Sequence, residues 1–136
     1  MKTPILLMTL LLLNMNCNNP VIPEKKENQK PVISSLTVSP EIVGLSDSVI
    51  VTCQATDPDG DTLVYDWITD GRVRIKGNPD WRSYLYNTYQ NSHVFYPKDI
   101  PRLPSLDTLW VQCFARDGKG KSDNGLVLFI LSKDKK

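Results

Sequence analysis

Short runs of alternating apolar and polar residues, each closed by a cluster of turn-forming residues, fill this sequence from residue 31 onward. The clearest run covers residues 48–56, where Val49, Val51 and Cys53 share one face and mainly polar residues occupy the other. Alternation with a period of two is typical of a strand with one buried face. The run ends at Asp-Pro-Asp-Gly-Asp (57–61), where proline fixes one backbone dihedral and glycine permits a positive one. We therefore expect a strand followed by a tight turn.

The rest of this region repeats the pattern, and no segment of it has a helical period. Residues 77–106 are the least regular part, with four of the ten prolines and six of the eleven aromatic residues. Closely spaced strands separated by Pro, Gly and Asp turns predict an all-β fold, a single β-sandwich of about seven strands. The further strands are expected at residues 32–38, 62–69, 72–76, 92–96, 108–116 and 126–131.

The first residues have the character of an export signal. Residues 5–13 are apolar except for one threonine, a run far shorter than the roughly 20 residues that span a bilayer. A short apolar run after a positively charged start suits a secretory signal. Cys17 follows the run, and this arrangement resembles a bacterial lipoprotein signal, which implies cleavage after residue 16 and a lipid on Cys17. Cleavage by an ordinary signal peptidase is the alternative.

The predicted organisation is a signal peptide (1–16), a lipidated N-terminus and flexible tether (17–30), one folded domain (31–133) and a short tail (134–136). The tether has two prolines and five charges in residues 18–30 and too little apolar content to fold alone. An exported lipoprotein is anchored to a bacterial membrane. We expect the outer membrane rather than the inner one, with the domain facing the periplasm or the surface.

Cys53 and Cys113 fall on the two strongest predicted strands, and Trp67 falls on the strand after the first. This Cys…Trp…Cys order is the pattern of immunoglobulin-like sandwiches, which have Greek-key connections. The resemblance implies a disulfide between the two cysteines with Trp67 packed against it in the core. Export would supply the oxidising compartment that the bond needs. Two unpaired buried thiols are the alternative.

Three further segments carry a closer resemblance. Ala-Thr-Asp-Pro-Asp-Gly-Asp at 55–61, Ala-Arg-Asp-Gly at 115–118 and Pro-Val-Ile at 31–33 resemble the PKD-type and cadherin-like immunoglobulin-fold modules of bacterial surface proteins. The resemblance covers residues 31 to 133. It implies an extracytoplasmic binding, adhesion or spacer module, although a shared fold does not by itself determine function.

The composition argues against two classes of function. With 16 basic and 15 acidic residues, the chain lacks the clustered basic excess of a nucleic-acid-binding protein. The one histidine, His93, follows Ser92 directly, and adjacent residues on a strand point to opposite faces, so they would not form a nucleophile–base pair. We predict no enzymatic activity and interpret His93 as an exposed residue at a strand end.

Calcium is the one cofactor that the residues suggest. Asp57, Asp59 and Asp61 stand at alternate positions and could offer carboxylate oxygens to Ca²⁺. Cadherin-like modules bind calcium at similar turns, usually with acidic residues from a neighbouring module. The alternative is that the aspartates cap the turn, as Asp117 would do on the partner strand.

An apolar surface is the stronger functional hypothesis. If Cys113 points inward, then Trp110 and Phe114 point outward, and by the same count Val64 and Ile68 point outward on the Trp67 strand. In an immunoglobulin-like sandwich these strands are neighbours, so the four side chains would form one patch of the kind that marks partner surfaces. The alternative is that residues 77–106 fold over this face and cover it.

The sequence therefore predicts a non-catalytic, membrane-anchored module that binds an envelope protein through this patch. The first rival is a structural spacer or accessory subunit without a discrete site. The second is a glycan-binding module with aromatic side chains that stack on sugars, namely Trp81, Tyr84, Tyr86 and Tyr89.

Overall fold

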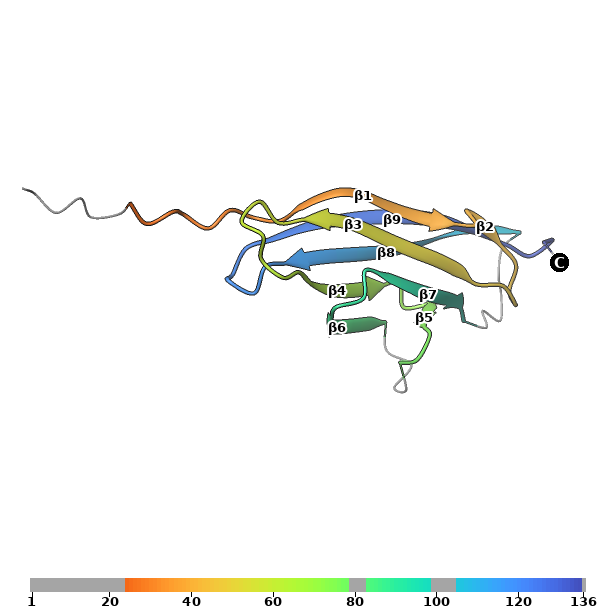
Figure 1. Cartoon of the computed structure of the whole chain (residues 1–136). Coiled ribbons are helices and arrows are strands. Elements are labelled where there is room, and N and C mark those ends of the chain that lie inside the picture. Colours follow the sequence, from red (N-terminus) through yellow and green to blue (C-terminus); the bar gives the residue numbers. More distant parts are fainter. Residues whose placement is uncertain (1–23, 79–82, 99–104, 136) are drawn as a thin grey trace, which may run out of the picture.

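The computed structural model describes residues 24–78, 83–98 and 105–135, and in these residues it contains nine strands and no helix (Figure 1). The prediction of an all-β sandwich is confirmed. The count exceeds seven because two short edge strands, β2 and β6, are not among the strands expected from the sequence. The strands are β1 (Val32–Ser39), β2 (Ile42–Val43), β3 (Val49–Thr56), β4 (Val64–Thr69), β5 (Val73–Ile75), β6 (Tyr84–Thr88), β7 (Ser92–Pro97), β8 (Leu106–Arg116) and β9 (Ser122–Ser132).

Two sheets form the layers of the sandwich. The four-stranded sheet has the order β1-β3-β7-β5, and the five-stranded sheet has the order β2-β9-β8-β4-β6. The chain crosses from one sheet to the other at every connection from β1 to β8. Only β8 and β9 form a hairpin within one sheet, and they pair along their whole length, from Leu106 opposite Ser132 to Arg116 opposite Ser122.

The core lies between the sheets and is built from alternate residues of their strands. Leu109, Val111, Cys113 and Ala115 of β8 are fully buried, where the alternation of the sequence places them. Trp67 of β4 is fully buried as well. Its indole N–H donates to the carbonyl of Gln90 (3.4 Å), so its one polar group has a partner.

The sandwich is closed along one side and open along the other. On the closed side β1 lies beside β9 (Figure 1). Leu36 of β1 packs close to Gly125 of β9, because glycine has no side chain. A methyl group at position 125 would stand 3.4 Å from the Leu36 side chain. On the open side, the edges are β5 in one sheet and β6 in the other.

The irregular region 77–106 contributes one edge strand and one interior strand where the structure describes it. Residues 84–88 form β6, which pairs with β4 at the edge of the five-stranded sheet. Residues 92–97 form β7, which pairs with β3 and β5 in the other sheet. These described segments extend the two sheets, and neither β6 nor β7 lies across the outer surface of β8.

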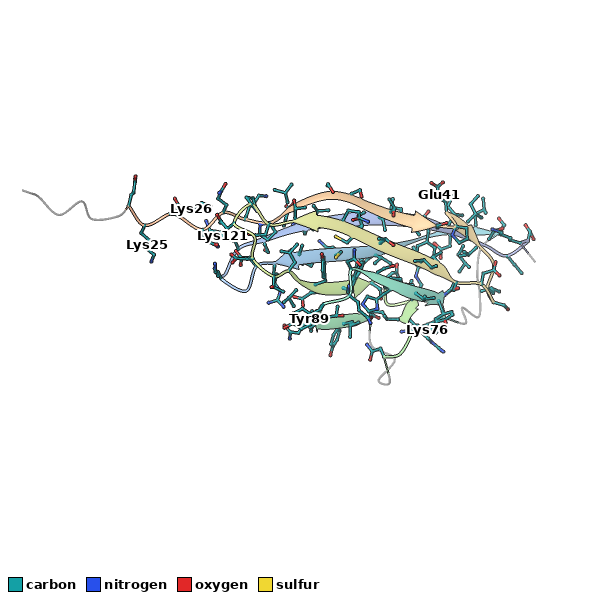
Figure 2. The ribbon with its side chains drawn as sticks, in the orientation of Figure 1. Lys25, Lys26, Glu41, Lys76, Tyr89 and Lys121 are labelled. Carbon is teal, nitrogen blue, oxygen red and sulfur yellow. The ribbon has the colours of Figure 1, made fainter. Side chains whose placement is uncertain are left out.

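The last residues of the predicted tether are fastened to one end of the sandwich. The ammonium of Lys26 pairs with Asp59 (2.6 Å), and the backbone N–H of Gln29 donates to the same carboxylate (2.6 Å). The amide of Asn28 donates to Asp117 (2.6 Å). Figure 2 shows Lys26 at this end. The chain is therefore held against the turns of the domain before β1 begins.

In the residues that the structure covers, no helix has the length and apolar character that crossing a membrane requires. The predicted signal peptide and the lipidation site at Cys17 lie outside the described residues.

Candidate functional site

The outer surface of the five-stranded sheet brings together the four side chains of the predicted patch. On β8, Trp110 and Phe114 alternate with fully buried residues and are themselves half-buried. On β4, Val64 and Ile68 do the same. Ile68 lies opposite Gln112, so Trp110 and Phe114 are its diagonal neighbours on the adjacent strand. Asp66 and Gln112 lie between them on the same surface, so the four residues form an interrupted apolar strip across two strands.

The neighbouring strand β9 adds two leucines that the sequence analysis did not assign to this surface. Leu128 lies opposite Trp110 and is 53% exposed, and Leu126 lies opposite Gln112 and is 56% exposed. The segment 126–131 is apolar on both faces, so its sequence predicts a strand but does not show which residues face outward. Its alternate residues, Phe129 among them, do enter the core. We call the set Val64, Ile68, Trp110, Phe114, Leu126 and Leu128 the apolar face.

Polar side chains lie within and around the apolar face and are bonded to one another, with Gln112 between Trp110 and Phe114 and Asp66 between Val64 and Ile68. Arg116 of β8 donates to Asp66 of β4 (2.9 Å) and to the amide oxygen of Asn87 (2.8 Å). Gln112 donates to Asn124 across the β8–β9 pair (3.4 Å). These polar groups already have hydrogen-bond partners. Covering the face with an apolar partner surface would therefore leave few of them buried without a hydrogen bond.

The two cysteines face each other across the core, from β3 in one sheet and β8 in the other. Both are fully buried free thiols in this structure, so the disulfide that the resemblance implied is not formed here. Cys53, together with burial, raises the pKa of the Cys113 thiol, whereas Cys113 lowers the pKa of the Cys53 thiol. Both thiols are fully buried, so neither is accessible to a reagent in solution.

The aspartates of the turn at 57–61 are occupied by other groups of the chain. One carboxylate oxygen of Asp57 accepts the backbone N–H groups of Asp59 (2.8 Å) and Asp61 (3.1 Å), which caps the turn. Lys26 pairs with Asp59 and Lys119 pairs with Asp61, each at 2.6 Å. The Lys26 pair is the main cause that lowers the pKa of Asp59 to about 2.

The three carboxylates nevertheless lie close enough to share a cation, since one oxygen of each falls within 4.8 Å of the others. In the described residues, the second oxygens of Asp57 and Asp61 are buried without a hydrogen-bond partner, whereas both oxygens of Asp59 are engaged by Lys26 and Gln29. A calcium ion bound through Asp59 would have to displace one of these groups. The two backbone N–H groups that Asp57 accepts support its role as the cap of the turn.

The tyrosines of the glycan hypothesis lie at the open side of the sandwich. Tyr84 and Tyr86 of β6 stack on each other, with ring centres 4.8 Å apart and ring planes 22° apart. Tyr89, in the loop after β6, is 74% exposed. Trp81 lies outside the described residues.

His93 on β7 is half-buried, and the prediction that it is an exposed strand-end residue was wrong. Its ring meets the ring of Trp67 edge to face, with centres 5.5 Å apart. The hydroxyl of the adjacent Ser92 is bonded to Thr52 (2.9 Å), so it is engaged away from the imidazole. The two residues do not form a catalytic pair.

Comparison with known proteins found no matching family model, no matching curated protein and no matching solved structure.

Proposed function

We propose that this chain is a non-catalytic binding module that engages a protein partner through the apolar face. The observation that carries the proposal is the exposure of Leu126 and Leu128, both more than half exposed, beside the half-buried Trp110. Contiguous exposed apolar surface rimmed by polar groups is a feature of partner-binding sites.

The composition of the apolar face suits a protein interface. Burial of a leucine side chain contributes about 1.5–3 kcal/mol when it goes from full exposure to full burial, so a half-exposed leucine retains about half of that for a partner. Tryptophan is enriched among the residues that dominate binding energy. Trp110 lies at one end of the apolar face opposite Leu128, and the pair supports one dominant contact with apolar area beside it.

The rival function is a structural spacer with no discrete site. A covered apolar face would favour the spacer, and an open one favours binding. In the part of the chain that the structure covers, the region 77–106 adds β6 to the edge of one sheet and β7 to the interior of the other, and the two leucines of β9 stay exposed. These observations support binding.

We also propose that the module belongs to the bacterial envelope and is immunoglobulin-like, of the PKD or cadherin type. The lipoprotein-like signal at 1–16 with Cys17, and the turn sequences at 55–61 and 115–118, support this assignment. The partner would then be another envelope protein. Mass spectrometry of the exported chain tests the anchor: a diacylated or triacylated Cys17 is expected, and a Cys17→Ser variant should leave the membrane fraction.

Site-specific photo-crosslinking in the envelope tests the proposed face. A photoreactive amino acid at position 128 should give a discrete adduct with one protein. The same amino acid at position 50 is the matched control, because Ile50 is 50% exposed on the outer surface of the opposite sheet. Adducts that are the same at both positions, or absent at position 128, would contradict the proposal.

A further inference from the structure

A second concave surface lies at the β6 edge of the sandwich, beside the apolar face, because Tyr84 of β6 stands opposite Ile68. It is a groove of about 600 Å³ between β6, the loop that follows it and the end of β5. Figure 2 shows Lys76 and Tyr89 on this side of the molecule. The side chains that matter for its chemistry are Lys76, Tyr86, Asn87, Tyr89, Gln90 and His93.

Two aromatic rings are available at this groove. Tyr86 is 50% exposed, and its stacking on Tyr84 restrains the ring before any ligand arrives. Tyr89 is 74% exposed. Exposed tyrosines offer an apolar ring face together with a polar hydroxyl. A pyranose ring has the complementary form, with C–H groups on its faces and hydroxyls around its edge.

The polar groups of the groove supply hydrogen bonds and positive charge. Among the described residues, the Gln90 amide and the Lys76 ammonium have no side-chain partner, and both residues are exposed. The Nε2 atom of His93 is buried and has no hydrogen-bond partner among the described residues. No aspartate or glutamate lines the groove where the structure describes it.

The backbone around the groove is held in place. Asn87 has a φ of 58°, in the left-handed region that asparagine tolerates better than most residues. Its backbone N–H donates to Asp66 (2.8 Å), and its side-chain oxygen accepts from Arg116 (2.8 Å). A preformed site loses less conformational entropy when a ligand binds.

We propose that this groove binds an acidic oligosaccharide, with a sugar ring against Tyr86 and Tyr89 and its carboxylate near Lys76. The tyrosine rings and the side-chain amides suit a sugar. The Lys76 ammonium, in a groove whose described lining has no carboxylate, favours an anionic sugar over a neutral one. A nucleic acid would need several basic groups along its backbone. The proposal uses residues outside the apolar face, so it stands or falls separately from the protein-binding function.

The first experiment is an array of soluble oligosaccharides: uronic-acid chains, sialylated chains and neutral glucose chains. We expect retention of acidic members and weak or no retention of neutral ones. NMR titration with the best-retained member should then shift the ring protons of His93, which is the sole histidine of the chain and gives an unambiguous signal.

Variants separate the parts of the proposal. A Tyr86→Ala/Tyr89→Ala variant should weaken binding about tenfold or more, as expected for lost ring contacts. Lys76→Gln should abolish the preference for acidic over neutral chains. Leu128→Ser is the control that should bind sugar as the original chain does. Binding that is unchanged in the double tyrosine variant, equal for acidic and neutral chains, or absent for every member would overturn the proposal.

Discussion

Cys53 in the four-stranded sheet and Cys113 in the five-stranded sheet are both fully buried, and the thiol of each shifts the pKa of the other, so the two cysteines meet across the core. An oxidising compartment would convert such a pair to a disulfide that ties the sheets together. The bond would close a loop of about 60 residues, for which the chain-entropy estimate gives roughly 4 kcal/mol of stabilisation.

We therefore predict that the oxidised domain is more stable than the reduced one by a few kcal/mol. Urea unfolding with and without reductant measures the difference. The Cys53→Ala/Cys113→Ala variant is the control, and its stability should not respond to reductant. Two free thiols in the exported protein, counted after unfolding, would show that the bond does not form.

The attachment of residues 24–30 should depend on pH. The pair with Lys26, followed by the N–H of Gln29, lowers the pKa of Asp59 from 3.8 to about 2. A carboxyl whose folded pKa is depressed stabilises the contact above its unfolded pKa and loses that effect as pH falls toward the folded value. The attachment should therefore persist from neutral pH to about pH 4 and weaken between about pH 4 and pH 2.

Backbone NMR relaxation of residues 24–30 measures this change. Their amides should be ordered near neutral pH and mobile at the acidic end. Asp59→Asn should make them more mobile throughout, while the β8–β9 amides stay rigid. Equal order of the segment at both ends of the pH range, in a domain that remains folded, would rule out the ion pair as the fastener.

His93 should titrate below the ordinary histidine range, because burial lowers its pKa. Its Nε2 atom is buried without a partner among the described residues, so a proton there would be unsatisfied. A depressed histidine pKa means that stability is full above the unfolded value, near pH 6.5, and declines as pH falls below it. An NMR titration of the ring gives the pKa directly, and a midpoint at or above 6.5 would contradict the burial.

Calcium should have little effect on the domain. Asp59 and Asp61 are each paired with a lysine, and Asp57 caps the turn. We predict no shift in melting temperature at millimolar calcium. A Lys119→Ala variant is the informative comparison, because it frees Asp61 for a cation. A clear calcium-dependent rise in the melting temperature of the original chain would restore the calcium hypothesis.

The strands that form the core could be predicted because their alternation is local. The period of two places Val49, Val51 and Cys53 of β3 on one face, and the same count orients Trp67 and Cys113. The pairing of β6 with β4 and of β7 with β3 could not be predicted, since partner choice depends on residues far apart in the sequence. The alternation of apolar and polar residues within a strand does not show which strand it pairs with.

The candidate site was predictable only in part, for similar reasons. Trp110 and Phe114 alternate with buried residues, so their outward direction followed from the inward Cys113. Leu126 and Leu128 lie in a run that is apolar on both faces, and only the register with β8 orients them. The ion pair between Lys26 and Asp59 joins residues 33 positions apart, so no local sequence pattern predicts it.

The central claim is that the apolar face binds a protein partner. Its most direct test is the affinity of the crosslinked partner for Leu126→Ser/Leu128→Ser, measured beside Ile50→Ser as the matched control. All three positions are at least half exposed, so the variants should fold and melt much as the original does. We predict a loss of binding of about tenfold or more for the double leucine variant and no loss for Ile50→Ser. Equal affinity for the two variants would contradict the claim.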